Sequence, residues 1–325
     1  MRRRAIPLVI LGLAGATFGY CQEEPQVETR SELSTAEKEA LLKEMERYAG
    51  ARTLLDSSPE QLLRDLPELH ELEFASEQGQ LTLILSKVGE TVAAFFRDFP
   101  NTTAFEQIRQ ERLGPNGKVE ERQNQTFRYL AVARPQANEV LFEEYRASKK
   151  GKRVEVRFMH GMSFVTSGFV SMPDQFHPRY QPEANYRYLG MQNTEGRKAY
   201  VVAFAQVPEK ARLFGRFGLG DHIAALLLQG VAWIDPATYQ IVRMHSDLLA
   251  PRFDIFLSRQ STDAQFSEVQ FKSGFPALWL PREVVVTIEW RGQLFRNYHH
   301  YSDFKLFKVE TEEKRQPLGV GPSPQ

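Results

Sequence analysis

The feature that most constrains this fold is a strict two-residue alternation close to the C-terminal end of the chain. Along one segment, Val284, Val286, Ile288 and Trp290 share one phase, while Val285, Thr287, Glu289 and Arg291 share the other. Successive side chains of a strand point to opposite faces, so the segment is predicted to be a strand with one buried apolar face and one solvent-exposed face. Residues 279–290 and 294–309, joined at Arg291–Gln293, then predict an antiparallel sheet curled around an apolar interior.

Most of the chain beyond residue 102 also consists of strand-like segments separated by turn sequences. Gly114-Pro115-Asn116-Gly117 and Asp235-Pro236-Ala237-Thr238 are strong turn sequences, and each predicts a hairpin between its flanking segments. Both phases of 200–205 are apolar, which is typical of a central, buried strand. Residues 172–184 carry prolines and aromatics and are predicted to form a long surface loop. The remaining strand-like segments are 105–113, 119–133, 140–147, 153–170, 231–234, 239–249 and 255–271.

Before residue 102 the pattern is helical. Ser34 and Glu37 form a capping box that predicts a helix to about Ala49, and Ser58-Pro59-Glu60-Gln61 begins a second helix in the same way. The third helix follows from an apolar stripe at helical spacing and ends at Phe99-Pro100. It could pack on a sheet or plug the mouth of a barrel. The stripe consists of Leu81, Ile84, Val88, Val92, Phe95 and Phe99.

These patterns predict an α+β chain that is mainly β. We expect a strongly curved antiparallel sheet, an incomplete barrel, with N-terminal helices packed on or over its opening. The expected divisions are a signal peptide at 1–21, a helical region at 22–101, the β half-barrel at 102–311 and a disordered tail at 312–325.

The first residues predict export. Arg2-Arg3-Arg4 precedes the uncharged run from Ala5 to Phe18, which has the length of a signal-peptide core and is too short to span a membrane. We therefore expect a periplasmic or secreted protein that does not span the membrane. Cys21, the single cysteine, lies where a lipid-modified cysteine would lie, but the bulky Tyr20 makes a lipid anchor unfavourable. Cleavage after Cys21 would leave a chain without thiols or disulfides.

Charge argues against nucleic acid as a partner. The formal net charge of the whole chain is +0, and loss of the three arginines with the signal would leave about −3. Nucleic acids and acidic membrane surfaces select for clustered Lys and Arg. The 23 phenylalanines instead predict a large apolar interior, either as core or as a ligand cavity.

No catalytic, cofactor or metal motif stands out, so we expect no enzyme, no cofactor and no metal site. His299 and His300 are consecutive in a strand and should point to opposite faces, and so should Glu143 and Glu144. A glycine-rich segment with Gly215, Gly218 and Gly220 lacks the spacing of a phosphate-binding loop and is interpreted as a mobile flap between strands.

One hairpin carries a family resemblance. At Ala232-Trp233-Ile234-Asp235-Pro236-Ala237-Thr238, followed by Ile241-Val242-Arg243, the sequence resembles the outer-membrane lipoprotein-sorting superfamily, the carriers and sensors built like the periplasmic lipoprotein chaperone. The resemblance covers about residues 153–310. In the stretches 87–102, 201–206 and 280–284 the chain also resembles a group of uncharacterised exported bacterial proteins. It is longer than the lipoprotein carrier by an N-terminal helical region and a hairpin.

The superfamily resemblance implies a curved, incomplete barrel with helices over its opening and an apolar cavity for acyl chains. The first hypothesis is therefore an exported protein that binds a lipid or a lipoprotein acyl chain. Two alternatives stay open: a ligand-free module that binds another envelope protein or senses envelope stress, and a hydrolase of unrecognised type. The predicted ligand-lining residues are Phe204, Trp233, Val286, Ile288 and Trp290.

Overall fold

The computed structural model describes residues 9–13, 46–48, 50–136, 139–148, 164–212, 215–219, 222–272 and 274–307. Most of the predicted signal segment, the predicted helix from Ser34 except residues 46–48, residues 153–163 of a predicted strand, Gly220 and the tail from 312 lie outside these residues. Within the described part, no helix is both long and apolar enough to cross a membrane.

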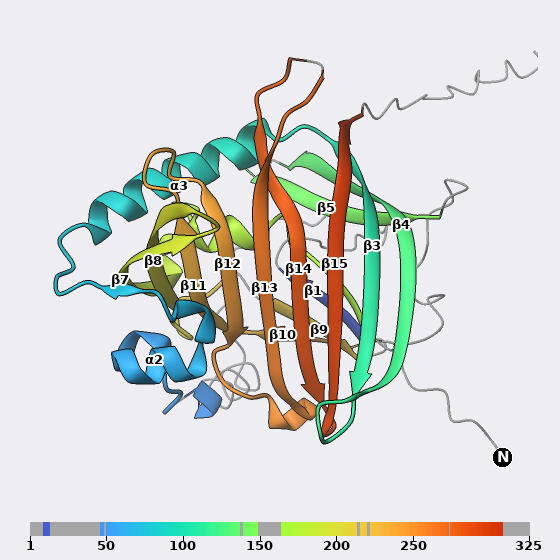
Figure 1. Cartoon of the computed structure of the whole chain (residues 1–325), viewed down its shortest axis with the longest axis horizontal. Coiled ribbons are helices and arrows are strands. Elements are labelled where there is room, and N and C mark those ends of the chain that lie inside the picture. The colour runs from blue at the N-terminus through green and yellow to red at the C-terminus, as the bar shows by residue number, and fades with distance from the viewer. Residues whose placement is uncertain are drawn as a thin grey trace, which may run out of the picture.

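Eleven strands of the described residues form one curved, unclosed sheet, as predicted from the alternation (Figure 1). Its order is β2-β7-β8-β11-β12-β13-β14-β15-β3-β4-β5, and every pair of neighbours is antiparallel. The edge strands β2 and β5 do not pair with each other, so the barrel stays incomplete. The strands are β2 (Glu73–Phe74), β3 (Thr102–Leu113), β4 (Val119–Gln136), β5 (Glu139–Ala147), β7 (Ala184–Thr194), β8 (Arg197–Gln206), β11 (Leu228–Ile234), β12 (Ile241–Leu248), β13 (Leu257–Val269), β14 (Leu278–Trp290) and β15 (Gln293–Leu306).

The predicted hairpins are confirmed in position. Trp290 pairs with Gln293 across a two-residue turn in which Arg291 and Gly292 both have positive φ, 53° and 70°. Two left-handed residues match the right-handed twist of the flanking strands, which fixes the register of β14 on β15. That register places Ile288 opposite Phe295. The apolar phase of both strands therefore lies on one side of the sheet.

One side of the sheet, here called the inner face, buries a large apolar cluster drawn from β7, β8, β11 to β15 and β3 to β5. The third predicted helix is confirmed as α3 (Leu81–Asp98), and it runs across one end of the sheet in Figure 1. Its stripe of Ile84, Val88 and Val92 packs into this cluster together with Phe96 and Phe99. The helix therefore covers the inner face.

The prediction of a surface loop at 172–184 is wrong. This stretch contains two short 3-10 helices, η4 (Met172–Phe176) and η5 (Gln181–Glu183), and in η4 both Met172 and Phe176 are buried in the inner cluster. The prolines correctly indicated an irregular backbone, but the apolar side chains of this stretch are buried under α3. Gly89 permits this approach, because a Cβ there would lie 2.7 Å from Nε2 of Gln181.

On the opposite side, the outer face, the described N-terminal helices cover β7, β8 and β11, and Glu68 of η2 (Pro67–Leu69) reaches His245 of β12. There α2 (Pro59–Asp65), η1 (Leu54–Asp56) and η2 pack leucines onto the sheet. The predicted capping box of α2 is present, with Ser58 and Gln61 bonded to each other's backbone N–H. The N-terminal helices thus divide between the two faces, α2 outside and α3 inside.

A second, four-stranded sheet of described residues has the order β10-β9-β1-β6. Its strands are β1 (Val9–Leu13), β6 (Phe164–Ser167), β9 (Gly215–Leu219) and β10 (His222–Leu226). Phe217 of β9 and Leu226 of β10 belong to the inner cluster of the large sheet. The small sheet therefore forms a layer over the inner face, and β1, from the predicted signal segment, holds a middle place in it.

Candidate functional site

The predicted ligand-lining residues separate into two groups. Phe204, Val286, Ile288 and Trp290 lie together in the inner cluster, each no more than 4% exposed. Trp233 lies on the outer face. Gly230 pairs with Phe204 and shares its face, and Trp233 follows Gly230 by three residues, so the side chains of Trp233 and Phe204 point to opposite faces. Its indole donates to Gln192 Oε1 at 2.9 Å beneath the leucines of α2 and η2. The sequence placed Trp233 in a buried strand but could not assign its face, since both phases of β11 are apolar.

The inner face is covered by side chains that do not belong to the large sheet. The ring centroid of Phe176 lies 5.9 Å from that of Phe204, and the ring of Phe217 lies 6.5 Å from that of Trp290. The indole of Trp290 donates to the carbonyl of Ile255 at 2.9 Å. In the full chain, therefore, the four predicted lining residues on the inner face belong to one cluster with α3, η4 and the small sheet.

The predicted glycine flap falls in that small sheet. Gly215 and Gly218 lie in β9, which pairs with β10 as a hairpin, and Gly220 lies outside the described residues. A Cβ at Gly215 would lie 3.4 Å from Leu226 and from Leu228, at ordinary van der Waals distance. This hairpin is part of the inner covering layer.

The interior is polar at one end, beneath β3, β5 and β15. Glu106, which is fully buried, accepts two hydrogen bonds from Arg146, both at 2.7 Å. His299 Nδ1 and the Tyr301 hydroxyl also contact Glu106 Oε1, at 2.9 and 2.8 Å. The other ring nitrogen of His299 contacts the Thr166 hydroxyl of β6 at 2.5 Å. A neutral imidazole with its proton on Nδ1 satisfies both contacts.

Burial and ion pairing act against each other in this cluster. Burial alone raises the pKa of Glu106, but Arg146 and then His299 more than offset it, and the pKa lies at about 2. Burial lowers the pKa of His299, although Glu106 opposes that change. Burial also raises the pKa of Glu144, whose Oε2 accepts from the Gly168 N–H at 2.8 Å. The buried pair of Glu106 and Arg146 is therefore ionised at neutral pH.

The predicted divergence of consecutive polar residues is confirmed. His299 faces the buried cluster, while His300 contacts Glu283 on the outer side at 2.5 Å. The cluster itself was not predicted from the sequence. The available signal was that Glu106 shares the phase of Ala104 and Ile108, because a charge in the apolar phase of a strand demands a buried partner.

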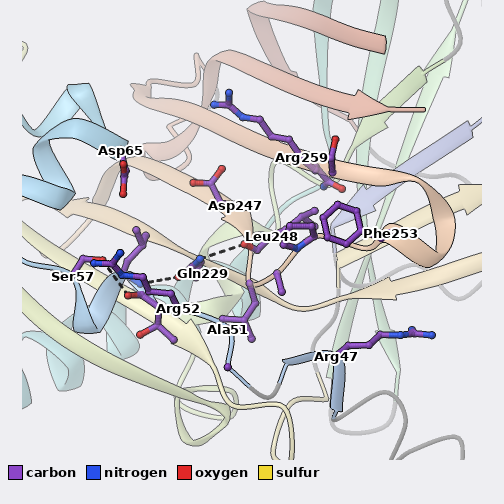
Figure 2. Close-up of a pocket in the computed structure, with 18 of the residues that line it drawn as sticks. Arg47, Ala51, Arg52, Ser57, Asp65, Gln229, Asp247, Leu248, Phe253 and Arg259 are labelled. Carbon is purple, nitrogen blue, oxygen red and sulfur yellow. Dashed lines mark hydrogen bonds between the residues drawn. The ribbon is translucent and has the colours of Figure 1, made fainter. Parts of the chain in front are cut away.

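An open groove lies on the outer side, between the N-terminal segment and the β12–β13 connection (Figure 2). Its volume is about 730 Å³. Gln229 joins its two walls, because Oε1 accepts from the Leu54 N–H at 2.8 Å while Nε2 donates to the Leu248 carbonyl at 3.3 Å. Charges of both signs line it, namely Arg47, Arg52, Arg259, Asp65, Asp247 and Asp254. This mixed lining shows no preference for an anion or a cation.

Comparison with known proteins gives no matching family model and no match among curated proteins. Among solved structures, the chain is similar to a domain described as an outer membrane lipoprotein-sorting protein from Vibrio parahaemolyticus. The identity is 12%, the match covers 70% of this chain and 94% of that chain, and the TM-score is 0.37. A DUF1329 family protein from Desulfovibrio piger is similar at 11% identity, with 69% and 92% covered and a TM-score of 0.37.

Proposed function

We propose that the exported chain binds the acyl chain of a lipid or lipoprotein between the inner face of the large sheet and the small sheet that covers it. The observation that carries the proposal is the place of β1. Val9–Leu13 is part of the predicted signal segment, yet it separates β6 from β9 in the covering layer. Export would remove this strand and leave its position vacant.

The vacated position would be narrow and long, and it would lie over an apolar surface. Neighbouring strands are about 4.8 Å apart, so β6 and β9 would flank a slot about 10 Å wide. Leu11 pairs with Thr166 on one side and Phe217 on the other, and both of these are buried. Beyond them lies the inner cluster with Ile288 and Trp290.

Burial of an acyl chain at this position contributes enough free energy for binding without polar contacts. Each buried methylene contributes about 0.8 kcal/mol, so about ten of them give about 8 kcal/mol, equivalent to a Kd of about 1 µM before ordering costs. The site needs no catalytic group, in keeping with the binding role expected from the sequence.

The first experiment is native mass spectrometry of the chain from Gln22 onward, purified from its own envelope fraction. We expect a bound lipid mass, and a fluorescent fatty acid should bind in a saturable way after delipidation. Val286→Phe adds bulk to the inner face and should weaken that binding at least tenfold. Val285→Phe adds the same bulk on the opposite face of β14 and should leave it unchanged. Equal effects of the two variants, or no lipid in either measurement, would refute the proposal.

A second candidate function is a module that binds an extended apolar peptide. The observation that favours it is the backbone pairing of β1 with β6 in parallel and with β9 in antiparallel orientation. Removal of β1 exposes these backbone groups, and a peptide strand restores their hydrogen bonds while an acyl chain does not. The test is hydrogen exchange of the chain from Gln22 with a synthetic peptide of residues 8–14. New protection in β6 and β9 supports the module, and unchanged exchange excludes it.

A further inference from the structure

A cluster of charged side chains lies on the outer face, apart from the proposed lipid site. His245 of β12 is 8% exposed and lies among Glu68 of η2, Asp247 of β12 and Asp263 of β13. Its Nδ1 is 3.0 Å from Glu68 Oε1 and 3.6 Å from Asp263 Oδ2. One ligand atom from each of Glu68, His245 and Asp263 lies within 4.8 Å of the other two. The two neighbouring strands β12 and β13 and the distant η2 thus bring one nitrogen and two oxygens together.

Two of these atoms lack hydrogen-bond partners. Among the described residues, neither His245 Nδ1 nor Glu68 Oε1 makes a hydrogen bond, although both atoms are buried. Buried polar atoms are nearly always paired, so each unpaired one requires an explanation. The two atoms face each other across 3.0 Å, where they form an ion pair when His245 is protonated. A group that accepts lone pairs from both would satisfy them.

The spacing fits a tetrahedral metal ion. Zinc binds imidazole nitrogen and carboxylate oxygen at about 2.0–2.2 Å, which places neighbouring tetrahedral ligand atoms roughly 3.4 Å apart. The observed 3.0 and 3.6 Å lie on either side of that value. Small side-chain shifts would bring all three atoms to bonding distance, and water could take the fourth position.

The surrounding contacts orient the imidazole for this role. His245 Nε2 lies 2.8 Å from Asp247 Oδ2, so a proton on Nε2 is held by that carboxylate and Nδ1 presents its lone pair to the cluster. Histidine ligands of metals commonly donate their second N–H to a carboxylate in this way. Arg243 donates to Asp263, with Nη2 2.7 Å from Oδ2 and Nε 3.1 Å from Oδ1, which fixes the position of that carboxylate.

We propose that Glu68, His245 and Asp263 form a binding site for a divalent transition-metal cation, with zinc as the best match. The site would tie η2 of the N-terminal segment to β12 and β13 of the sheet. Without a cation, a proton takes its place. Burial alone lowers the pKa of His245, but the contacts with Asp247 and the other carboxylates raise it to about 10. The proposal is independent of lipid or peptide binding on the inner face.

The test is calorimetric titration of the chelator-treated chain from Gln22 with zinc, together with metal analysis after gel filtration. We expect one zinc per chain and a rise in Tm on binding. His245→Asn and Glu68→Gln should each weaken binding at least tenfold; Glu68 is only partly buried, so Glu68→Gln remains informative if His245→Asn fails to fold. His300→Asn is the matched control, because His300 contacts a single carboxylate, Glu283, at the surface, and it should bind zinc normally.

Two results would overturn the proposal. Zinc binding to the wild-type chain that does not saturate would be one; His245 would then be an imidazolium that is held by its neighbouring carboxylates. Binding that persists unchanged in both His245→Asn and Glu68→Gln would place the zinc elsewhere.

Discussion

The buried ion pair of Glu106 and Arg146 offers the sharpest test of the fold's energetics. Arg146→Met removes the guanidinium but keeps much of the apolar stem, so it isolates the charge. The Glu106 carboxylate is fully buried and keeps only its contacts with His299 and Tyr301 in the variant. A buried charge without its partner is costly, and removal of one member of such a pair typically destabilises a protein by about 3–5 kcal/mol.

The pKa of Glu106 gives a similar magnitude. It lies at about 2 against an ordinary value of 4.5, and a shift of this size corresponds to about 3 kcal/mol of stability. Because the folded-state pKa is the lower one, this stability is present above pH 4.5 and is lost as the pH falls from 4.5 toward 2. Without Arg146, burial dominates and raises the pKa of Glu106. The variant should therefore gain stability relative to wild type as the pH is lowered from neutrality.

The assay is urea unfolding of the chain from Gln22, followed by tryptophan fluorescence at pH 7 and pH 5. Arg146→Met should lower the free energy of unfolding by about 3–5 kcal/mol at pH 7, and by less at pH 5. The double variant Glu106→Gln/Arg146→Met should recover part of the loss, because it removes the unpaired charge. Arg282→Ala breaks an exposed pair with Glu195 and should cost at most about 1 kcal/mol. A loss below about 1 kcal/mol for Arg146→Met, or no recovery in the double variant, would refute this reasoning.

Three further predictions concern packing and are checked by the same unfolding measurement. Ile288→Ala, at a fully buried inner position, should cost about 2–5 kcal/mol, and Val285→Ala on the half-buried outer phase should cost less; equal losses would contradict the assignment of faces. Gly230→Ala places a Cβ 2.0 Å from a carbonyl oxygen of β12 and should cost at least about 1–3 kcal/mol, whereas Gly79→Ala meets nothing within 4 Å and should stay within about 0.5 kcal/mol. Ser58→Ala removes the cap of α2 and should cost about 0.5–2 kcal/mol; no change would show that packing alone holds this helix.

The strands and turns could be predicted because their signals are local. Alternation over β14 and the turn residues around 114–117 and 235–238 act through neighbouring residues, and the structure reproduces those hairpins. The apolar stripe of α3 is equally local. Where both phases were apolar, as in β11, the same reasoning found the strand but not its faces, and Trp233 was grouped with residues that lie on the other side.

The cluster of Glu68, His245 and Asp263 could not be predicted from any motif. Glu68, His245 and Asp263 come from a 3-10 helix and two strands, and their proximity depends on how η2 docks on the outer face. The buried ion pair was hidden for a related reason. Glu106 and Arg146 lie in strands that pair only through β4 between them, so neither segment alone indicates a partner for its charge.

The sequence by itself determined the main hairpins, the helix α3 and the mainly antiparallel character of the sheet, because backbone periodicity and turn preferences act over a few residues. Only the tertiary structure decided what covers each face. It placed α3, η4 and the small sheet inside and α2 outside, and it buried a stretch with the composition of a surface loop. Those choices depend on shape and charge complementarity between segments far apart in the chain. Periodicity shows that a face is apolar, but the partner that buries it is set by long-range packing.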